Sequence, residues 1–210
     1  VIFQAGDSPQ GRELGAATAD VLFTHAASIE QGQAFYRDVK GRAAQRGRDP
    51  EQILVMPGAE IYVGDTDEHA REIEQHYHQV DHSFELALKE FGRNFGWHDF
   101  SQYDLDAPFP QESLEAARSS FFTNAKRIAD QAWAQGFSLR QAVEFGRQLR
   151  PGAFVGAAET VAAKMTEWFE ARALDGFNIY IGHPGQFRRF TEEVVPLLQA
   201  RGVYRTAYEG

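Results

Sequence analysis

Four short apolar segments, separated by stretches of helical pattern, set the narrowest limit on what this chain folds into. They occupy residues 1–5, 20–24, 53–56 and 176–181, and each is predicted to be a strand. Their composition is apolar throughout rather than alternating, which is typical of parallel strands covered on both faces. The sequence therefore predicts an α/β fold with a parallel sheet.

Two architectures fit this pattern equally well, namely half of a (β/α)8 barrel and an open, doubly wound sheet. In both, ligands and catalytic groups lie where the parallel strands end at their C-termini. The residues that directly follow the predicted strands are therefore the first candidates for a functional site.

About half of the chain lies between the third and fourth predicted strands, and its patterns are mostly helical. Apolar residues three and four apart predict one long helix over residues 67–91. An aromatic, proline-punctuated loop follows, and then two more predicted helices. We expect βα units at residues 1–56, a mostly helical insertion at 57–155, and a last βα unit with a C-terminal helix at 156–210.

The composition excludes several classes of function. The net charge is -9 and the basic residues are scattered, so the chain lacks the basic surface that nucleic-acid binding needs. Its apolar runs are much shorter than the ~20 residues that cross a bilayer, and no membrane partner is expected. The chain has no cysteine, which excludes disulfides and cysteine nucleophiles. A cytoplasmic protein is the default expectation.

The turn after the first strand has the composition of a helix start. It consists of Ala5, Gly6, Asp7 and Ser8, followed by Pro9. Ser8 is suited to cap a helix, Pro9 to its first position, and Gly6 to a close approach of the backbone to a ligand. The N–H groups of a helix start favour a phosphate. The same residues also fit a turn that only begins a helix, and an inward Asp7 carboxylate would disfavour an anion.

Three histidines are weak candidates for catalysis. His25 and His183 follow the second and fourth predicted strands, and His98 lies in the aromatic loop. Each has the chemistry of a general acid or base. A structural loop histidine fits each position as well, and the catalytic residues stay unknown.

Three further histidines, His76, His78 and His82, lie on the helix predicted over residues 67–91. His78 and His82 are four apart, as two metal ligands on one helix would be. However, both point away from the apolar stripe, and no HExxH pattern accompanies them. No metal site is expected.

Several ordered segments carry a family resemblance. They are QAGDSPQGRELGAATADVLFT, ILVMPGAEIYVGDTDEHA, DFSQYDLDAPFP, ALDGFNIYI and FTEEVVPLLQARGVYRTAYEG. Together they resemble the C-terminal half of the flavin-dependent monooxygenases of the bacterial luciferase superfamily. The resemblance is greatest to the branch of nitrilotriacetate monooxygenase component A, dibenzothiophene sulfone monooxygenase, long-chain alkane monooxygenase and pristinamycin synthase, and it covers essentially the whole chain.

The resemblance implies a fold and an activity. The fold would be strands five to eight of a (β/α)8 TIM barrel, with a large helical insertion between the last two strands. The activity would be that of an FMN-dependent, two-component monooxygenase, which receives reduced FMN from a separate flavin reductase and uses O2 to oxygenate a small organic substrate. A homo-oligomer is expected. The substrate itself cannot be read from the fold.

The resemblance also assigns roles to residues. The FMN phosphate is expected at Ala5, Gly6, Asp7 and Ser8. Ser8 matches the second serine of the family's Gln-Ala-Gly-Ser-Ser turn, and Asp7 replaces the first. Residues 156–159 lack the Ser or Thr that relatives use as a helix cap, at an expected cost of about 1 kcal/mol.

The helical insertion resembles a lid over the substrate pocket. Its aromatic loop is the part expected to touch substrate, although such a loop also fits a packed surface cover. The loop residues in question are Phe95, Trp97, His98, Phe100 and Tyr103.

The four earlier strands of such a barrel have no counterpart in the chain. Because half a barrel exposes strand edges, we expect either a fragment whose N-terminal half is missing or a half-barrel completed by another chain. Residues around the isoalloxazine ring are expected in the absent half. Two alternatives to the enzyme stay open: a flavin- or phosphate-binding module without turnover, and a structural fragment with no ligand.

Overall fold

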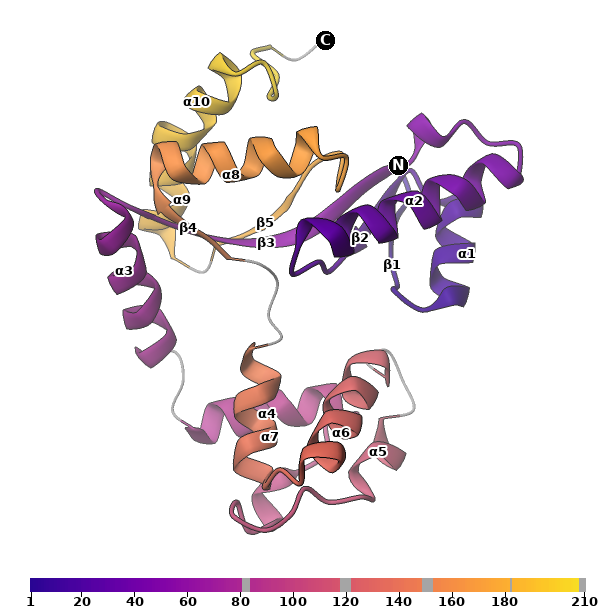
Figure 1. The fold of residues 1–210 in the computed structure, drawn as a ribbon, viewed down its shortest axis with the longest axis vertical. Helices are drawn as coiled ribbons and strands as arrows, with labels where there is room; N and C mark the ends of the chain where they lie inside the picture. The colour runs from indigo at the N-terminus through magenta and orange to yellow at the C-terminus, as the bar shows by residue number, and fades with distance from the viewer. Residues whose placement is uncertain (81–83, 118–121, 149–152, 182, 208–210) are drawn as a thin grey trace. The chain divides into compact units, whose positions relative to one another are not determined.

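The computed structural model describes residues 1–80, 84–117, 122–148, 153–181 and 183–207. The chain divides into two compact units (Figure 1). We call Val1–His76 together with Pro151–Gly210 the sheet unit, and Tyr77–Arg150 the helical unit. Each unit is described by itself.

Five parallel strands form the sheet in the described residues. The order is β1-β2-β3-β4, and β5 also pairs with β3. Glu60 of β3 pairs with both Ala153 and Tyr180, so β4 and β5 lie on opposite edges of β3. The strands are β1 (Phe3–Ala5), β2 (Val21–Thr24), β3 (Leu54–Gly64), β4 (Ala153–Ala157) and β5 (Asn178–Tyr180). The predicted α/β fold with a parallel sheet is confirmed.

Two expectations about the strands are wrong. The third strand continues through Pro57 and Gly58 to Gly64, although Pro and Gly usually mark a strand's end. The strand β4 was not predicted, because its five residues, AFVGA, include a glycine and give too short a pattern. The helical insertion therefore lies between β3 and β4 and not between the last two strands, and both strands extend into the range 57–155.

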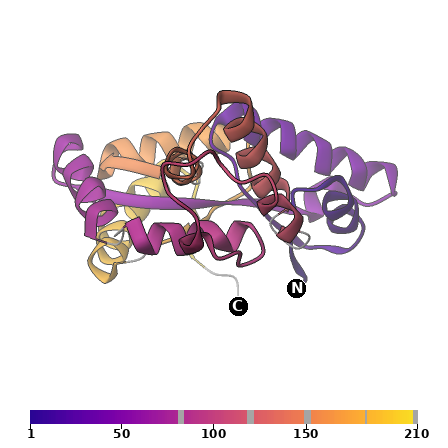
Figure 2. The same cartoon turned by 90° about the horizontal axis from the view of Figure 1, so that it is seen from below.

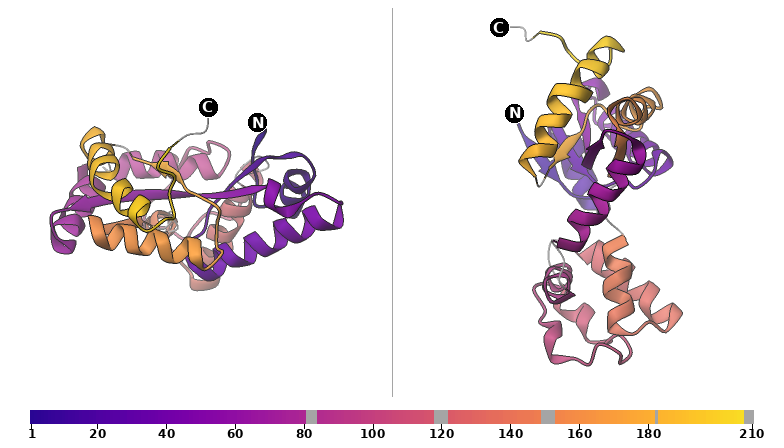
Figure 3. Two further views of the ribbon diagram at one scale, coloured as in Figure 1. Left: turned by 90° about the horizontal axis from the view of Figure 1, so that it is seen from above. Right: turned by 90° about the vertical axis from the view of Figure 1, so that its left-hand side faces the viewer.

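The sheet is covered by helices along one face. Alternate β3 residues, including Val55, Ile61 and Val63, are buried and pack in two hydrophobic clusters with residues of α2 and α8. Figure 3 shows both helices along the same side of β3. The helices of this unit are α1 (Pro9–Thr18), α2 (Ile29–Gln45), α3 (Asp67–Val80), α8 (Ala158–Glu170), α9 (Pro184–Arg189) and α10 (Val195–Ala200).

The opposite face of the sheet is more exposed, which corrects the expectation of strands covered on both faces. Leu54, Met56, Gly58, Glu60 and Tyr62 of β3 are partly or fully exposed, in strict alternation with the buried residues. We call these residues and their strand partners Phe23, Asn178 and Tyr180 the open face. Leu54 is 42% exposed and Tyr180 69% exposed.

A buried ion pair fastens the beginning of β3. Lys40 Nζ lies 3.2 Å from Asp175 Oδ2 and donates to the carbonyls of Pro50 and Ile53 at 2.9 and 2.6 Å. The Tyr36 hydroxyl donates to Asp175 Oδ1 at 2.9 Å. Burial and the Asp175 carboxylate raise the pKa of Tyr36 to about 12. These contacts join α2 to the segment before β5 at the N-terminal end of β3.

The C-terminal helix contains a π-helical segment, Phe190–Val194, between α9 and α10. Pro196 lies in the first turn of α10, where its missing N–H costs little. The helix thus widens locally just before Pro196.

The helical unit, which Figure 2 shows from below, has its own core. Phe95, Phe100 and Phe109 are buried and pack with Ile128 and Val143. The helices are α4 (Phe84–Asn94), α5 (Ser113–Ala116), α6 (Phe122–Gln135) and α7 (Leu139–Gln148). The single helix predicted over residues 67–91 is described as two helices, α3 and α4; residues 81–83 between them lie outside the described residues.

Candidate functional site

The turn after β1 begins α1 as the sequence predicts. Ser8 is the N-cap, and its Oγ accepts the Gly11 N–H at 3.1 Å. The Ser8 carbonyl accepts the Arg12 N–H at 2.9 Å, and Pro9 occupies the first helical position. Since Oγ only accepts in this cap, the hydroxyl proton of Ser8 is free to be donated to a ligand.

Contacts with two neighbouring elements fix the shape of this turn. Asp7 Oδ1 accepts a hydrogen bond from Thr24 Oγ1 at 2.6 Å, and Thr24 is buried at the end of β2. Arg12 Nε donates to the Asp7 carbonyl at 2.9 Å, while its Nη1 lies 3.1 Å from Asp38 Oδ2 on α2. One oxygen of the Asp7 carboxylate is therefore committed to β2.

Two glycines bring the backbone of the turn close to the first turn of α1. A Cβ on Gly6 would lie 3.3 Å from Gly11 Cα, and a Cβ on Gly11 would lie 3.1 Å from three backbone atoms of Gly6. In the part of the chain that the structure describes, no hydrogen bond engages the N–H groups of Ser8 and Gln10. The turn thus presents two N–H groups and one hydroxyl at the positive end of a helix.

His25 lies on the same rim of the sheet as this turn. It follows Thr24, is exposed, and its ring meets the ring of Phe23 edge to face, with centroids 4.8 Å apart. A Cβ on Gly58 would lie 3.2 Å from the Phe23 ring and 3.8 Å from His25 Nδ1. The structure therefore brings His25, Asp7 and the open face of β3 into one neighbourhood.

The other two candidate histidines lie elsewhere. His183 is the N-cap position of α9, which follows β5 in the chain. His98 belongs to the helical unit, where its Nε2 lies 2.9 Å from the Tyr103 hydroxyl and its ring packs on Phe100. The structure does not assemble the three histidines into one site.

Most of the aromatic loop forms the core of the helical unit. Phe95 and Phe100 are fully buried, so the expectation that they contact substrate is wrong and the packed alternative holds for them. Trp97 differs, being 70% exposed with a left-handed backbone at φ 66°. A bulky residue rarely adopts that conformation.

The start of α8 is capped by another part of the chain. Ala157 is its N-cap and offers no side-chain cap, but Asp67 Oδ1 accepts the Ala157 N–H at 2.7 Å. This hydrogen bond, with a second from the Thr160 side chain, holds the pKa of Asp67 below its ordinary value. Asp67, at the beginning of α3, thus satisfies a different N–H of this helix start, that of the N-cap residue, and offsets part of the expected loss from a missing Ser or Thr cap.

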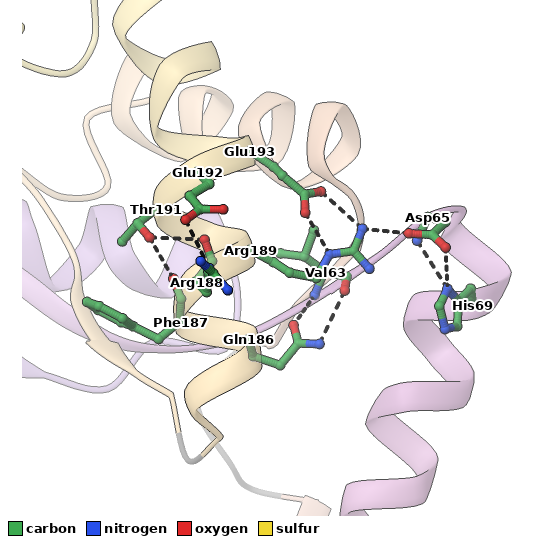
Figure 4. A network of polar contacts seen from close by, with 10 residues as sticks. All are labelled: Val63, Asp65, His69, Gln186, Phe187, Arg188, Arg189, Thr191, Glu192 and Glu193. Carbon is green, nitrogen blue, oxygen red and sulfur yellow. Dashed lines mark hydrogen bonds and ion pairs between the residues drawn. The ribbon is translucent and has the colours of Figure 1, made fainter.

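A second polar network lies at the far end of β3 (Figure 4). Arg189 Nη2 lies 2.7 Å from Asp65 Oδ1, and Arg189 Nε lies 2.9 Å from Glu193 Oε1. His69 Nδ1 accepts the Asp65 N–H at 3.2 Å. The Gln186 side chain accepts the Val63 N–H at 2.7 Å and donates to the Val63 carbonyl at 3.3 Å. These contacts tie the start of α3 to α9.

The described residues contain no group of three or more His, Asp or Glu side chains that could hold a metal ion. His76 is exposed, and the side chains of His78 and His82 lie outside the described residues. Among the helices that the structure describes, none combines the length and apolar character needed to cross a membrane.

Glu60 is a residue of the open face that the sequence analysis missed. It stands between Gly58 and Tyr62 on that face, and the Tyr62 hydroxyl approaches Glu60 Oε2 at 3.5 Å. The sequence does mark this residue, because Glu60 is the one acid within the otherwise apolar segment LVMPGAEIYVG. It lies at a position that alternates with the buried residues of the strand.

Comparisons with known proteins give consistent matches. The family model of luciferase-like monooxygenases matches residues 1–175. N-acetyl-S-(2-succino)cysteine monooxygenase from Bacillus subtilis is 37% identical over all of this chain and 48% of its own length. Nitrilotriacetate monooxygenase component A from Aminobacter aminovorans is 36% identical over all of this chain and 46% of its own.

Solved structures agree with these relatives. The crystal structure of riboflavin lyase (RcaE) with modified FMN and substrate riboflavin superimposes with a TM-score of 0.73 at 25% identity, over all of this chain and 45% of that one. The chain thus spans about half the length of the curated relatives and of the solved structure it matches.

Proposed function

The chain belongs to the luciferase-like monooxygenase family, and we propose that it is part of an FMN-dependent monooxygenase in which the turn Ala5, Gly6, Asp7 and Ser8 binds the phosphate of FMN. The observation that carries the proposal is the Ser8-capped start of α1, whose free donors lie at the C-terminal end of a parallel strand. In parallel α/β sheets this is the edge where ligands bind.

The residues present fit the phosphate group. The N–H groups of Ser8 and Gln10 and the Ser8 hydroxyl supply three donors. The close contact of Gly6 with Gly11 leaves no side chain between the turn and a ligand. Bound FMN in its reduced form would supply the electrons for the reaction with O2, while the chain's own residues bind, orient and exclude water.

The remaining parts of the proposal concern the intact protein. We propose that the sheet forms strands of a (β/α)8 barrel, that the open face points into it, and that the helical unit acts as its lid. A separate flavin reductase as partner is supported by the component name of one relative. The small organic substrate, oligomeric assembly and cytoplasmic location belong to the same proposal. His25 directly follows Thr24, whose hydroxyl bonds Asp7 of the phosphate turn.

The replacement Ser8→Ala tests the proposal through ligand affinity. Loss of the hydroxyl should weaken FMN about tenfold, because a hydrogen bond to a charged group contributes about 1.5–3 kcal/mol. Riboflavin has no phosphate and should lose much less. Fluorescence titration of both flavins with the wild-type chain and the variant measures the two losses.

A matched control is Ser28→Ala, which removes the N-cap of α2 without touching the turn. It should change the two affinities equally. Equal losses of FMN and riboflavin in Ser8→Ala would show that the turn only begins a helix. Binding of FMN without oxygenation by the intact protein would favour a flavin-binding module.

A further inference from the structure

Glu60 is an acid at an unusual place, the middle of a parallel sheet. It pairs with Ala153 of β4 on one edge of β3 and with Tyr180 of β5 on the other. Strands in such positions are usually apolar along their whole length, and acidic residues are seldom buried without a partner. The presence of a carboxylate at this position of the sheet therefore needs a physical explanation.

Two tyrosines flank this carboxylate on the open face. Tyr62 follows two residues later on the same face, and its hydroxyl approaches Glu60 Oε2 at 3.5 Å. Tyr180 is the register partner of Glu60, one strand spacing of about 4.8 Å away, and its side chain is 69% exposed. Glu60 thus has an aromatic ring beside it along the strand and another across it.

In the part of the chain that the structure describes, the Glu60 carboxylate has no ion pair with a Lys, Arg or His side chain. Phe23 and Met56 on the open face are apolar and Asn178 is an uncharged amide, while His25 lies beside Gly58, two residues before Glu60. If this face is covered in the intact protein, a carboxylate left there without a positive partner would carry a large desolvation cost.

We propose that Glu60, Tyr62 and Tyr180 form a binding site for the ammonium group of an organic substrate. Aromatic rings around a negative charge are the chemistry that recognises organic cations, since the ring faces attract the cation and the carboxylate neutralises it. The inference names the substrate class of the proposed monooxygenase, and it rests on that proposed function for the covering of the open face.

The test compares the binding of an organic cation with that of an uncharged molecule of the same shape. Choline and 3,3-dimethylbutan-1-ol have the same shape and differ in the charge of one atom. Calorimetric titration or tyrosine ring NMR of the 210-residue chain should show choline binding about tenfold more tightly than the alcohol. Glu60→Gln should lower this preference to about threefold, because the tyrosine rings remain, and Tyr180→Leu should reduce it about threefold.

Glu170→Gln is the matched control, because Glu170 is an exposed acid at the end of α8. It should keep the full preference for choline. The inference is overturned if the wild-type chain binds both probes equally, or if Glu60→Gln keeps the full tenfold preference for choline. FMN affinity, measured in parallel, separates the two hypotheses: unaltered FMN binding without a choline preference defeats the cation site alone, and the reverse defeats the phosphate turn alone.

Discussion

The starts of α1 and α8 have nearly the same backbone and opposite arrangements of charge. Their N-cap residues, Ser8 and Ala157, have φ and ψ of -67° and 155°, and of -61° and 159°. At α8 the Asp67 carboxylate occupies the N–H of Ala157. At α1 the nearest carboxylate, that of Asp7, is bonded to Thr24 instead.

The difference distinguishes a helix start that can bind a ligand from one that cannot. A carboxylate at α8 already supplies the negative charge that a helix N-terminus favours, so this N-terminus is occupied by the protein itself. We call it the closed start, and the N-terminus of α1 the open start. At α1 the Ser8 side chain satisfies one N–H and leaves others for an anion from outside. Helix starts of equal geometry can thus be structural or functional, depending on where one acidic side chain is held.

The largest expected loss of stability is that of Gly156→Ala, which disturbs the contacts of Asp67 and Thr160 at the closed start of α8. A Cβ there would lie 2.8 Å from Asp67 Oδ1 and 2.7 Å from Thr160 Cγ2, so the cap must move. We expect a loss of about 2 kcal/mol in the free energy of unfolding, measured by urea denaturation.

Replacements of two other glycines serve as comparisons for Gly156→Ala. Gly6→Ala, at the open start, meets its nearest atoms at 3.1 and 3.3 Å and should cost less. Gly41→Ala on α2 meets nothing within 4 Å and should stabilise by about 0.5 kcal/mol. A loss in Gly156→Ala no larger than that in Gly6→Ala would contradict the tight packing of the α8 start.

A smaller effect is expected from Asp67→Asn, which removes only the charge from the α8 cap. The pKa of Asp67 is lowered by the Ala157 N–H and Thr160. Its stabilising effect is therefore complete above the ordinary carboxyl pKa of about 4 and is lost as pH falls through the lower folded value. Thermal unfolding should show the variant less stable at neutral pH and equal to the wild type in strong acid; a difference that does not change with pH would refute the cap.

The smallest effect concerns the shape of the open start. Arg12→Lys keeps the charge but loses the planar group that contacts both Asp7 and Asp38. We expect the preference for FMN over riboflavin to fall about threefold, with little change in stability. Flavin titrations measure this ratio.

Arg48→Lys provides the comparison for Arg12→Lys. Arg48 donates to the carbonyls of Ala16 and Ala19 at 3.0 and 2.8 Å, at the opposite end of α1. It should leave the FMN preference unaltered. If both variants lose the preference equally, Arg12 supports the helix as a whole and does not position the turn.

The sequence predicted local features of the molecule well. Ser8 and Pro9 identify the start of α1 because a cap and a first-turn proline act within a few residues. The family, and with it the parallel sheet, was recognisable because several ordered segments agree.

Contacts between residues that are far apart in the chain could not be predicted from the sequence. The partners Asp7 and Thr24 are 17 residues apart, and Asp67 and Ala157 are 90 apart; no local pattern specifies such pairs. For a similar reason the sequence left open whether Phe95 and Phe100 are buried, because an aromatic loop has the same composition whether it faces a ligand or its own core. Glu60 was missed because the third strand was predicted to end at Met56, before Pro57, whereas it continues to Gly64.

The side chain of Gln186 has a consequence for self-association. Its amide engages both backbone groups of Val63, as a neighbouring strand would, on a part of β3 that extends beyond its pairing with β5. Exposed strand edges are templates on which other chains add. A single glutamine thus blocks one edge of the sheet against intermolecular β-pairing, and the long strand remains a poor seed for aggregation at this point.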